Sequence, residues 1–455
     1  MVLLTETGRP PTNIKVCDAL MGSGKTSAAI QYMNQHPGRK FIYVSPRIEE
    51  DRRIVAACPM LYFALPSDKG RDRTKTVNLK RLLQAGRNVA ISHVLYTLCD
   101  DEVCALMRQH GYSMIIDEAV HIFEDAKVTR RDIETMMGSG AVRVTDNGYL
   151  EFSDGYDPDG HSEHFRRMWH LAASHKLVLL PNGQCCYWMV SDRMLLAAQE
   201  VIIMTYRFSA SDMARLMQIH HIPYAPIYVD TDGRGNYWFT DRVAYVPAYA
   251  GHMRDMVRIV DDQKLNAIGE KWNALSKGWW DTNMEAYRRS LAYGDDGSMR
   301  ETAASKATDA YRMRSLLRKY MRTDHPDTSA DDRLFGCFAK PGEFLKQKGY
   351  LNAHLVFNAT SLNEWGNRHV LAYLVNVFQR PEVDQYYQSL GFEGKRDEYA
   401  LTTMLQWIWR SAIRNGEPVE LYLPSRRMRE ILAAWINECE EDYKRLYHIS
   451  EEDTE

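Results

Sequence analysis

A glycine-rich turn between an apolar run and a helical pattern constrains this chain more than any other feature. Residues 14–20 read IKVCDAL, residues 19–26 read ALMGSGKT, and a helix rich in small residues follows. The pattern G-x-x-x-x-G-K-[ST] is met except that Ala19 replaces the first glycine. Backbone N–H groups of such a turn point inward at a helix N-terminus, where they bind phosphate oxygens. The order of strand, turn and helix therefore predicts a P-loop within an α/β fold.

The residue types in this turn suggest a role for each side chain. Gly22, Ser23 and Gly24 are expected to form the phosphate cradle. Lys25 would reach the β- and γ-phosphates, and Thr26 would ligate Mg²⁺. The sequence thus predicts ATP and Mg²⁺ as ligands.

An acidic pair supplies the second half of an ATPase site. The run SMIIDEAVH places Asp117 and Glu118 directly after an apolar strand, 92 residues beyond Lys25 (117 − 25). Asp117 can hold Mg²⁺, usually through water, and Glu118 can polarise an attacking water molecule. An acidic pair after a strand is common by itself, but its position in the same α/β block as the P-loop makes it specific.

Strands alternate with helices in two blocks, which predicts two α/β domains with parallel sheets. Two Asn-Gly dipeptides flanked by apolar runs, at residues 147–148 and 182–183, predict β-hairpins that interrupt the first block. The expected organisation is a first domain over residues 1–245 with a β-rich insertion at about 137–195, a second domain over 246–437, and an acidic tail over 438–455 that is frayed or disordered.

Composition argues against a zinc site and a membrane span, and it leaves nucleic-acid binding open. The net charge of −3 gives no overall basic signal. The eight cysteines lack the paired spacing of a zinc site, so we expect reduced thiols. Without a leader-like start or an apolar run of membrane-spanning length, the expected location is the cytoplasm, away from membranes.

The order of further motifs resembles that of superfamily 2 helicases, which consist of two tandem RecA-like domains. Residues 117–120 stand where that family has its DExx box. Thr205 stands in its Ser-Ala-Thr motif, which implies a role in coupling the ATP site to the nucleic-acid site. KFIYVSPR and AISHVLY resemble the motifs that contact nucleic acid in the first domain, with candidate residues Ser45, Pro46, Arg47, Ser92 and His93.

The second domain continues the resemblance. LVFNATSLNEWGNR is similar to the fifth motif, with Thr360 and Asn363 as candidate nucleic-acid contacts. QWIWRSAIR is similar to the sixth motif, where Gln406, Arg410 and Arg414 would share one helix face and either arginine would serve as arginine finger. The wording of these segments is also similar to helicase-like proteins encoded by bacteriophages.

The resemblance implies an ATP-dependent helicase or translocase on single-stranded or forked nucleic acid. The phage-like wording favours DNA over RNA, a role in replication or recombination, replication proteins as candidate partners, and the host cytoplasm. Two alternatives stay open: an ATP-gated loader that binds nucleic acid as a switch, and a remodelling or packaging ATPase that moves along duplex without unwinding it. The basic runs at residues 69–87 and 311–322 would contact phosphates or form solvated helix faces.

Overall fold

The computed structural model describes residues 13–448 apart from short gaps at 70–73, 121–122, 127, 129, 154–162, 174–175, 184, 189–191, 244, 295–297 and 360–363. It divides into two compact units. The first comprises Met1–Tyr245 with Arg380–Gly394, and the second Val246–Gln379 with Lys395–Glu455. Both are built on sheets of parallel strands alternating with helices, so the predicted α/β class with two RecA-like domains is confirmed.

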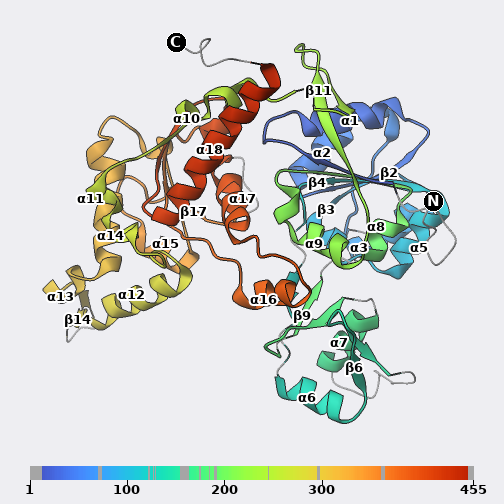
Figure 1. Ribbon diagram of the computed structural model, residues 1–455, viewed down its shortest axis with the longest axis horizontal. Coiled ribbons are helices and arrows are strands. Elements are labelled where there is room, and N and C mark those ends of the chain that lie inside the picture. Colours follow the sequence, from blue (N-terminus) through green and yellow to red (C-terminus); the bar gives the residue numbers. More distant parts are fainter. Residues whose placement is uncertain are drawn as a thin grey trace. The chain divides into compact units, whose positions relative to one another are not determined.

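A seven-stranded sheet with the order β12-β11-β1-β10-β4-β2-β3 forms the centre of the first unit (Figure 1). All neighbours are parallel except the β11–β12 pair. Two strands that follow β10 in the chain, β11 and β12, continue the sheet beyond β1. The strands are β1 (Asn13–Asp18), β2 (Lys40–Ser45), β3 (Val89–Ser92), β4 (Tyr112–Asp117), β10 (Glu200–Thr205), β11 (Ala225–Thr231) and β12 (Tyr237–Thr240).

Helices cover both faces of this sheet, because successive side chains of its buried strands point to opposite sides. Met114 and Ile116 of β4 join one core cluster, and Ile115 between them joins the other. The helices on the Ile115 side are α1 (Lys25–Gln35) and α2 (Ile48–Ala57). Those on the other side are α3 (Lys75–Gln84), α4 (His93–Thr97), α5 (Asp101–His110), α8 (Asp192–Ala197) and α9 (Asp212–Ile219).

The predicted hairpins lie in a small β-rich module inserted after β4. Gly148 and Gly183 have φ of 79° and 81°, the left-handed conformation that glycine adopts without strain. Each follows its asparagine in the turn of an antiparallel pair, so both hairpin predictions are confirmed. The elements are β5 (Phe123–Asp125), α6 (Arg130–Gly138), β6 (Val142–Val144), β7 (Leu150–Phe152), α7 (Glu163–Ala173), β8 (Leu177–Leu179) and β9 (Cys185–Trp188).

Residues 380–394 depart from a simple division of the chain into two halves, because they pack within the first unit although both flanking segments belong to the second. This strap contains α16 (Pro381–Ser389). The Tyr386 ring stacks on Phe123 at 5.7 Å, and the Tyr387 hydroxyl donates to Asp212 of α9 over 3.1 Å. The strap therefore contributes to the core of the first unit.

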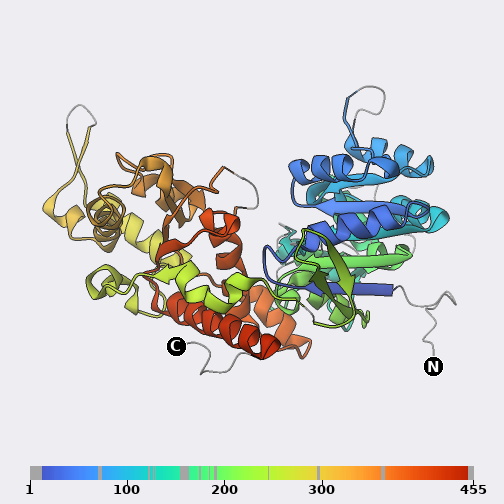
Figure 2. The same ribbon diagram turned by 90° about the horizontal axis from the view of Figure 1, so that it is seen from above.

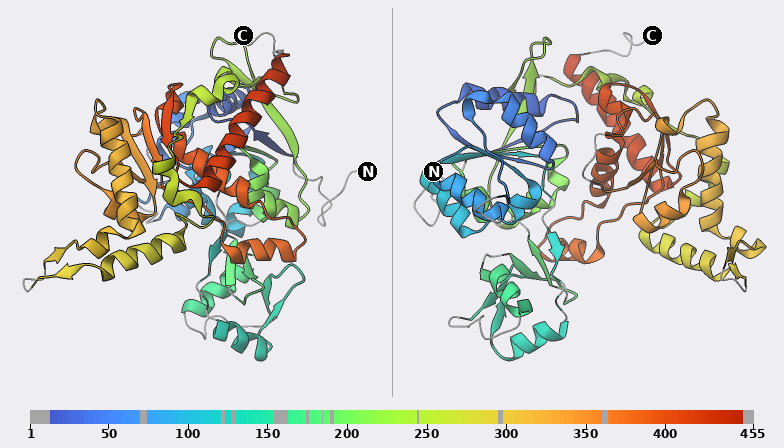
Figure 3. Two further views of the ribbon diagram at one scale, coloured as in Figure 1. Left: turned by 60° about the vertical axis from the view of Figure 1, so that its left-hand side comes forward. Right: turned by 180° about the vertical axis from the view of Figure 1, so that it is seen from behind.

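The second unit contains a parallel five-stranded sheet with the order β13-β19-β18-β16-β17. Figure 3 shows a small hairpin, β14–β15, at the end of α12. The strands are β13 (Val257–Ile259), β14 (Ala292–Tyr293), β15 (Met299–Arg300), β16 (Arg333–Cys337), β17 (His354–Val356), β18 (Val370–Tyr373) and β19 (Val419–Tyr422). The helices are α10 (Met253–Met256), α11 (Gln263–Asn266), α12 (Lys277–Arg289), α13 (Ala303–Lys306), α14 (Asp309–Arg318), α15 (Ala339–Leu345), α17 (Arg396–Ile408) and α18 (Arg426–Tyr447).

The expectation of a frayed tail from residue 438 was wrong for its first half, since α18 continues to Tyr447 (Figure 2). Packing explains the extension: Cys439 is buried, and a Cβ on Gly251 would lie 2.5 Å from the Tyr443 ring. The Tyr447 hydroxyl also donates to the carbonyl of Val246 over 3.1 Å. Among the described residues, no helix has the length and apolarity needed to cross a membrane.

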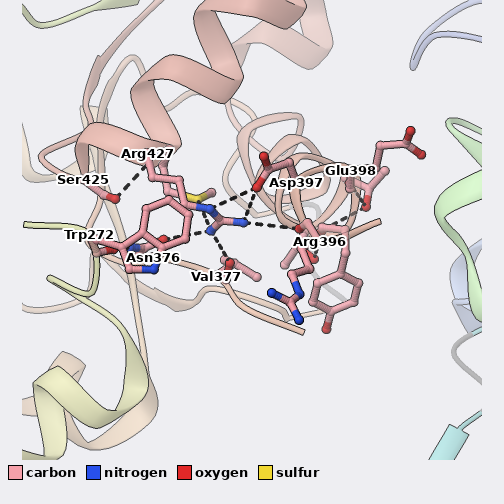
Figure 4. A network of polar contacts seen from close by, with 12 residues as sticks. Trp272, Asn376, Val377, Arg396, Asp397, Glu398, Ser425 and Arg427 are labelled. Atoms are coloured by element: carbon pink, nitrogen blue, oxygen red, sulfur yellow. Dashed lines mark hydrogen bonds and ion pairs between the residues drawn. The ribbon is translucent and has the colours of Figure 1, made fainter. Parts of the chain in front are cut away.

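Arg427, at the start of α18, holds together the two segments that lead into and out of the strap (Figure 4). Its guanidinium donates to the Val377 carbonyl over 2.7 Å on the outgoing segment, and to the Asp397 carboxylate over 2.6 Å on the returning one. It also lies over the rings of Phe378 and Trp272, at 4.5 and 5.4 Å from their centroids. A buried arginine with so many partners is costly to remove because its partners lose their donors.

We therefore expect Arg427→Ala to lower the free energy of unfolding by about 3 kcal/mol, measured by urea denaturation. Arg426→Ala is the matched control. Arg426 is an exposed neighbour that pairs with Glu430 one helical turn away, so its loss should cost less than about 0.5 kcal/mol. Equal effects of the two substitutions would contradict the structural role of Arg427.

Candidate nucleotide-binding site

The parallel register of β1, β10 and β4 brings the candidate site residues to one edge of the sheet. Asp18 pairs in register with Thr205, and Met204 pairs with Asp117. The Thr205 carbonyl accepts the N–H of Ala19 at 3.0 Å, so the start of the glycine-rich turn is tied to the end of β10. The P-loop, the acidic pair and Thr205 thus lie at the carboxyl ends of adjacent strands, where open α/β sheets bind ligands.

The P-loop has the backbone that its sequence predicts. Gly22 and Gly24 adopt φ of 78° and 85°, and α1 begins at Lys25. Lys25 Nζ donates to the carbonyls of Ala19 and Leu20 at 2.5 and 2.8 Å, so the ammonium lies inside the loop. Burial lowers the pKa of Lys25, while nearby carboxylates including Asp117 oppose that shift.

The Asp117 carboxylate meets two hydroxyl groups. Thr26 Oγ1, in the first turn of α1, lies 3.4 Å from Asp117 Oδ2, and the buried Tyr43 hydroxyl donates to the same oxygen over 2.8 Å. Burial and the neighbouring Glu118 raise the pKa of Asp117 to about 6, and the hydrogen bond from Tyr43 opposes this rise. Tyr43 was not anticipated from the sequence, because an aromatic residue in a buried strand is ordinarily part of the core.

Glu118 leaves the strand in an unusual conformation. Its φ of 65° is left-handed, which is uncommon for a residue with a side chain and is concentrated at functional sites. The Glu118 N–H donates to the Met204 carbonyl over 2.8 Å, which holds this turn against β10. The side chain is exposed at the carboxyl edge of the sheet, next to the buried Asp117.

Asp18 is a second residue that sequence reasoning missed. Its two carboxylate oxygens accept the N–H groups of Arg207 and Phe208 at 2.6 and 2.8 Å. Arg207 is itself left-handed, with φ of 53°. Asp18 therefore fixes the loop after β10 beside the P-loop, and the signal that could have revealed it is an acidic residue directly after the P-loop strand.

The donor set fits a nucleotide phosphate and a hard cation. Ser23 Oγ is buried and has no hydrogen-bond partner within the described part of the chain, as expected of a hydroxyl that a phosphate oxygen would satisfy. A Cβ on Gly24 would lie 2.2 Å from Tyr237, so only glycine fits at this helix N-terminus. Thr26 and Asp117 supply the oxygen ligands that Mg²⁺ prefers.

The nucleic-acid candidates of the first unit fall into two groups. Pro46 and Arg47 are partly exposed at the end of β2. Ser45 is instead fully buried and donates to Asp51 over 2.8 Å, while Ser92 caps α4 by accepting the N–H of Leu95. Ser45 and Ser92 are register partners, so the segments that follow β2 and β3 leave the sheet side by side.

His93, the first residue of α4, connects the segment after β3 to the acidic pair, because its Nε2 lies 2.9 Å from the Asp117 carbonyl. Burial lowers the pKa of His93, which favours the neutral ring. Thr360 and Asn363, the candidates expected in the second unit, lie outside the described residues.

The expectation that Gln406, Arg410 and Arg414 share one helix face was wrong. Helix α17 ends at Ile408, and Arg414 belongs to a separate 3₁₀ turn, Ala412–Asn415. Gln406 and Arg414 are exposed, whereas Arg410 is buried and its Nε donates to the Gln406 carbonyl over 3.2 Å. The extended backbone of Ser411, with ψ of −168°, separates the two helical segments.

Several cations of the basic runs form local ion pairs. Lys80 contacts Asp100 and Glu102, each at 2.6 Å. Arg314 contacts Glu301 at 2.9 Å, and the pairs Arg312–Asp309 and Lys319–Asp324 are similarly close. These contacts favour solvated, ion-paired faces over a dedicated phosphate track at those positions.

The buried contact between Ser45 and Asp51 leads to a prediction on pH dependence. Burial raises the pKa of Asp51 from 3.8 to about 6, against the hydrogen bond from Ser45. The folded protein thus binds this proton more tightly than the unfolded chain, and the resulting stability is lost as pH rises through 6. We expect Asp51→Asn to be more stable than the parent at pH 7.5 by about 1–2 kcal/mol, an advantage that disappears near pH 4.

Urea denaturation at a series of pH values measures this difference. Glu441→Gln, at an exposed position of α18 in the other unit, is the control and should change stability by less than about 0.5 kcal/mol at every pH. An advantage of Asp51→Asn that grows toward low pH would contradict the assigned direction of the shift.

Comparisons with known proteins match one region of the chain in one case and nearly the whole chain in others. A family described as "YonV C-terminal Rossmann-like domain" matches residues 251–436. The "SPbeta prophage-derived uncharacterized protein YonV" of Bacillus subtilis (strain 168) is 27% identical over 430 residues, which cover 93% of this chain and 98% of that protein.

Solved structures show weaker likenesses. The S. tokodaii Xpd4 structure is 12% identical and covers 97% of this chain and 95% of that chain, with a TM-score of 0.42. A variant of S. cerevisiae Dbp5 bound to RNA and ADP BeF3 is 10% identical and covers 95% and 84%, with a TM-score of 0.34. The fold assignment therefore rests on strand order and register.

Proposed function

We propose that this chain is a nucleic-acid-dependent ATPase that works as a helicase or translocase. The observation that carries the proposal is the convergence of Lys25, Thr26, Asp117 and Glu118 at the carboxyl edge of one parallel sheet. A strand without catalytic residues of its own, β10, lies between the strands that carry the P-loop and the acidic pair. Thr26 Oγ1 and Asp117 Oδ2 lie 3.4 Å apart across this spacing, close enough for both to hold one cation beside a bound triphosphate.

Each side chain at this edge has its own proposed role in ATP hydrolysis. Lys25 neutralises charge on the β- and γ-phosphates, and Thr26 and Asp117 hold Mg²⁺, which offsets phosphate charge when bound. Glu118 is exposed beside Asp117 and orients the water that attacks the γ-phosphate. Thr205, tied to Ala19 through its carbonyl, couples movement of β10 to the P-loop.

The segments directly after β2 and β3, the second of which is the start of α4, are the proposed nucleic-acid contacts. They leave the sheet side by side, with Pro46 and Arg47 accessible on one and the exposed Val94 on the other. His93 links this surface to the acidic pair, because its ring contacts the Asp117 carbonyl. The similarity to a prophage-derived protein supports a phage setting. DNA as the track, in phage replication or recombination, is part of the proposal.

Steady-state ATP hydrolysis with and without single-stranded DNA, single-stranded RNA and duplex tests the proposal. We expect stimulation by a single strand, and a loss of turnover of at least about a hundredfold in Lys25→Ala, because the phosphate charge is no longer neutralised. Lys277→Ala, at an exposed position in the second unit, is the control and should retain parental activity. Hydrolysis that responds to no nucleic acid would favour the ATP-gated loader, and stimulation by duplex alone would favour the remodelling or packaging ATPase.

Exposure distinguishes the two arginines after α17. An arginine finger needs a solvent-accessible guanidinium that can reach a nucleotide, so we assign the role to the exposed Arg414 and a structural role to the buried Arg410. Arg414→Ala should lower turnover by about a thousandfold or more without changing the melting temperature. Arg410→Ala should instead lower stability by about 1–3 kcal/mol and keep turnover per folded molecule. The reverse pattern would exchange the two roles.

A further inference from the structure

The β11–β12 hairpin brings an aromatic ring onto the P-loop. Tyr237 begins β12, and its ring lies so close to Gly24 that a Cβ there would be 2.2 Å from Cδ1 and 2.4 Å from Cε1. Strand β12 packs against α1, the helix that follows the P-loop, and Figure 1 shows that helix near the hairpin. The ring is only partly buried, although it contacts the backbone of the proposed phosphate site.

The hairpin is held in place by contacts outside the site. Phe239, two residues along the same face of β12, meets the Tyr32 ring of α1 at 6.1 Å. The turn before β12 is closed by Asp232, which accepts the backbone N–H groups of Arg234 and Asn236 at 2.8 and 3.2 Å. Tyr237 also meets the ring of Tyr245 edge to face at 6.4 Å. The position of Tyr237 is therefore fixed by packing on both sides.

Strand order shows which end of a nucleotide this ring would meet. In the order β12-β11-β1-β10-β4, Asp117 lies two strands from the P-loop strand on one side, and Tyr237 lies two strands away on the other. If Thr26 and Asp117 hold Mg²⁺, the terminal phosphates would lie toward β4 and the nucleoside would extend toward β11 and β12. Tyr237 therefore flanks the P-loop on the side opposite Asp117, four strand spacings or roughly 19 Å from it along the sheet.

We infer that Tyr237 is the stacking platform for the base of a nucleoside triphosphate bound at the P-loop. This inference rests on the proposed ATPase function and adds the base-binding residue to it. Tyrosine supplies a flat, rigid surface that stacks on a base at little entropic cost, and every base has such a face. Recognition by stacking needs no hydrogen-bonding motif for the base.

Isothermal titration with Mg-ATP and with Mg-tripolyphosphate tests the inference, because only ATP carries a base. Tyr237→Ala should weaken ATP binding by about tenfold, within a range of about 5- to 150-fold, and leave tripolyphosphate binding unchanged. Tyr237→Phe keeps the ring and should bind ATP within about twofold of the parent. Tyr62→Ala, which removes an exposed aromatic ring elsewhere on the first unit, is the matched control and should bind both ligands like the parent.

Three results would overturn the inference. Equal weakening of both ligands in Tyr237→Ala would make the ring a support of the P-loop, and tighter binding of both would make it a plug over the site. Unchanged ATP binding would leave the ring without a role in binding. A parent protein that binds neither ligand would instead refute the proposed ATPase function itself, so the two failures are distinguishable.

Discussion

The buried parallel ladder of β1, β10 and β4 is the constraint on which the site depends. These strands are covered by helices on both faces, so a register shift of one residue would turn every core side chain to the opposite layer. With the register fixed, Asp18 faces Thr205, and Asp117 faces Met204. The P-loop and the acidic pair then meet although 92 residues (117 − 25) separate Lys25 from Asp117. The positions of the P-loop and the acidic pair are thus a consequence of how the core of the sheet packs.

The features that sequence reasoning anticipated are local ones. The P-loop backbone follows from its two left-handed glycines, and both hairpins follow from Asn-Gly turns, because each motif restricts its own φ and ψ angles. Apolar runs of six or so residues indicate buried strands regardless of their neighbours. The α/β class and the place of Lys25, Asp117 and Glu118 at strand ends could therefore be predicted from short windows of sequence.

The features that escaped prediction depend on contacts between distant residues. Tyr43 acts through a carboxylate 74 positions away, and Tyr237 acts on a glycine more than two hundred residues before it. Helix α17 stops at Ile408 although apolar residues continue, since Ser411 takes an extended conformation. Helix α18 outlasts its apolar pattern because late residues such as Tyr443 find partners near residue 251. No local pattern encodes such pairings.

Because the strap belongs to the first unit, the chain crosses between the two units three times. The chain passes between the two units at residues 245–246, 379–380 and 394–395, so any relative movement of the units must be absorbed by backbone rotations at these three places. Arg427 holds the segments on the second-unit side of two of them, through Val377 and Asp397. Tyr386 and Tyr387 hold the strap within the first unit. The segments that flank the strap are thus tied to the second unit, and the strap itself is tied to the first.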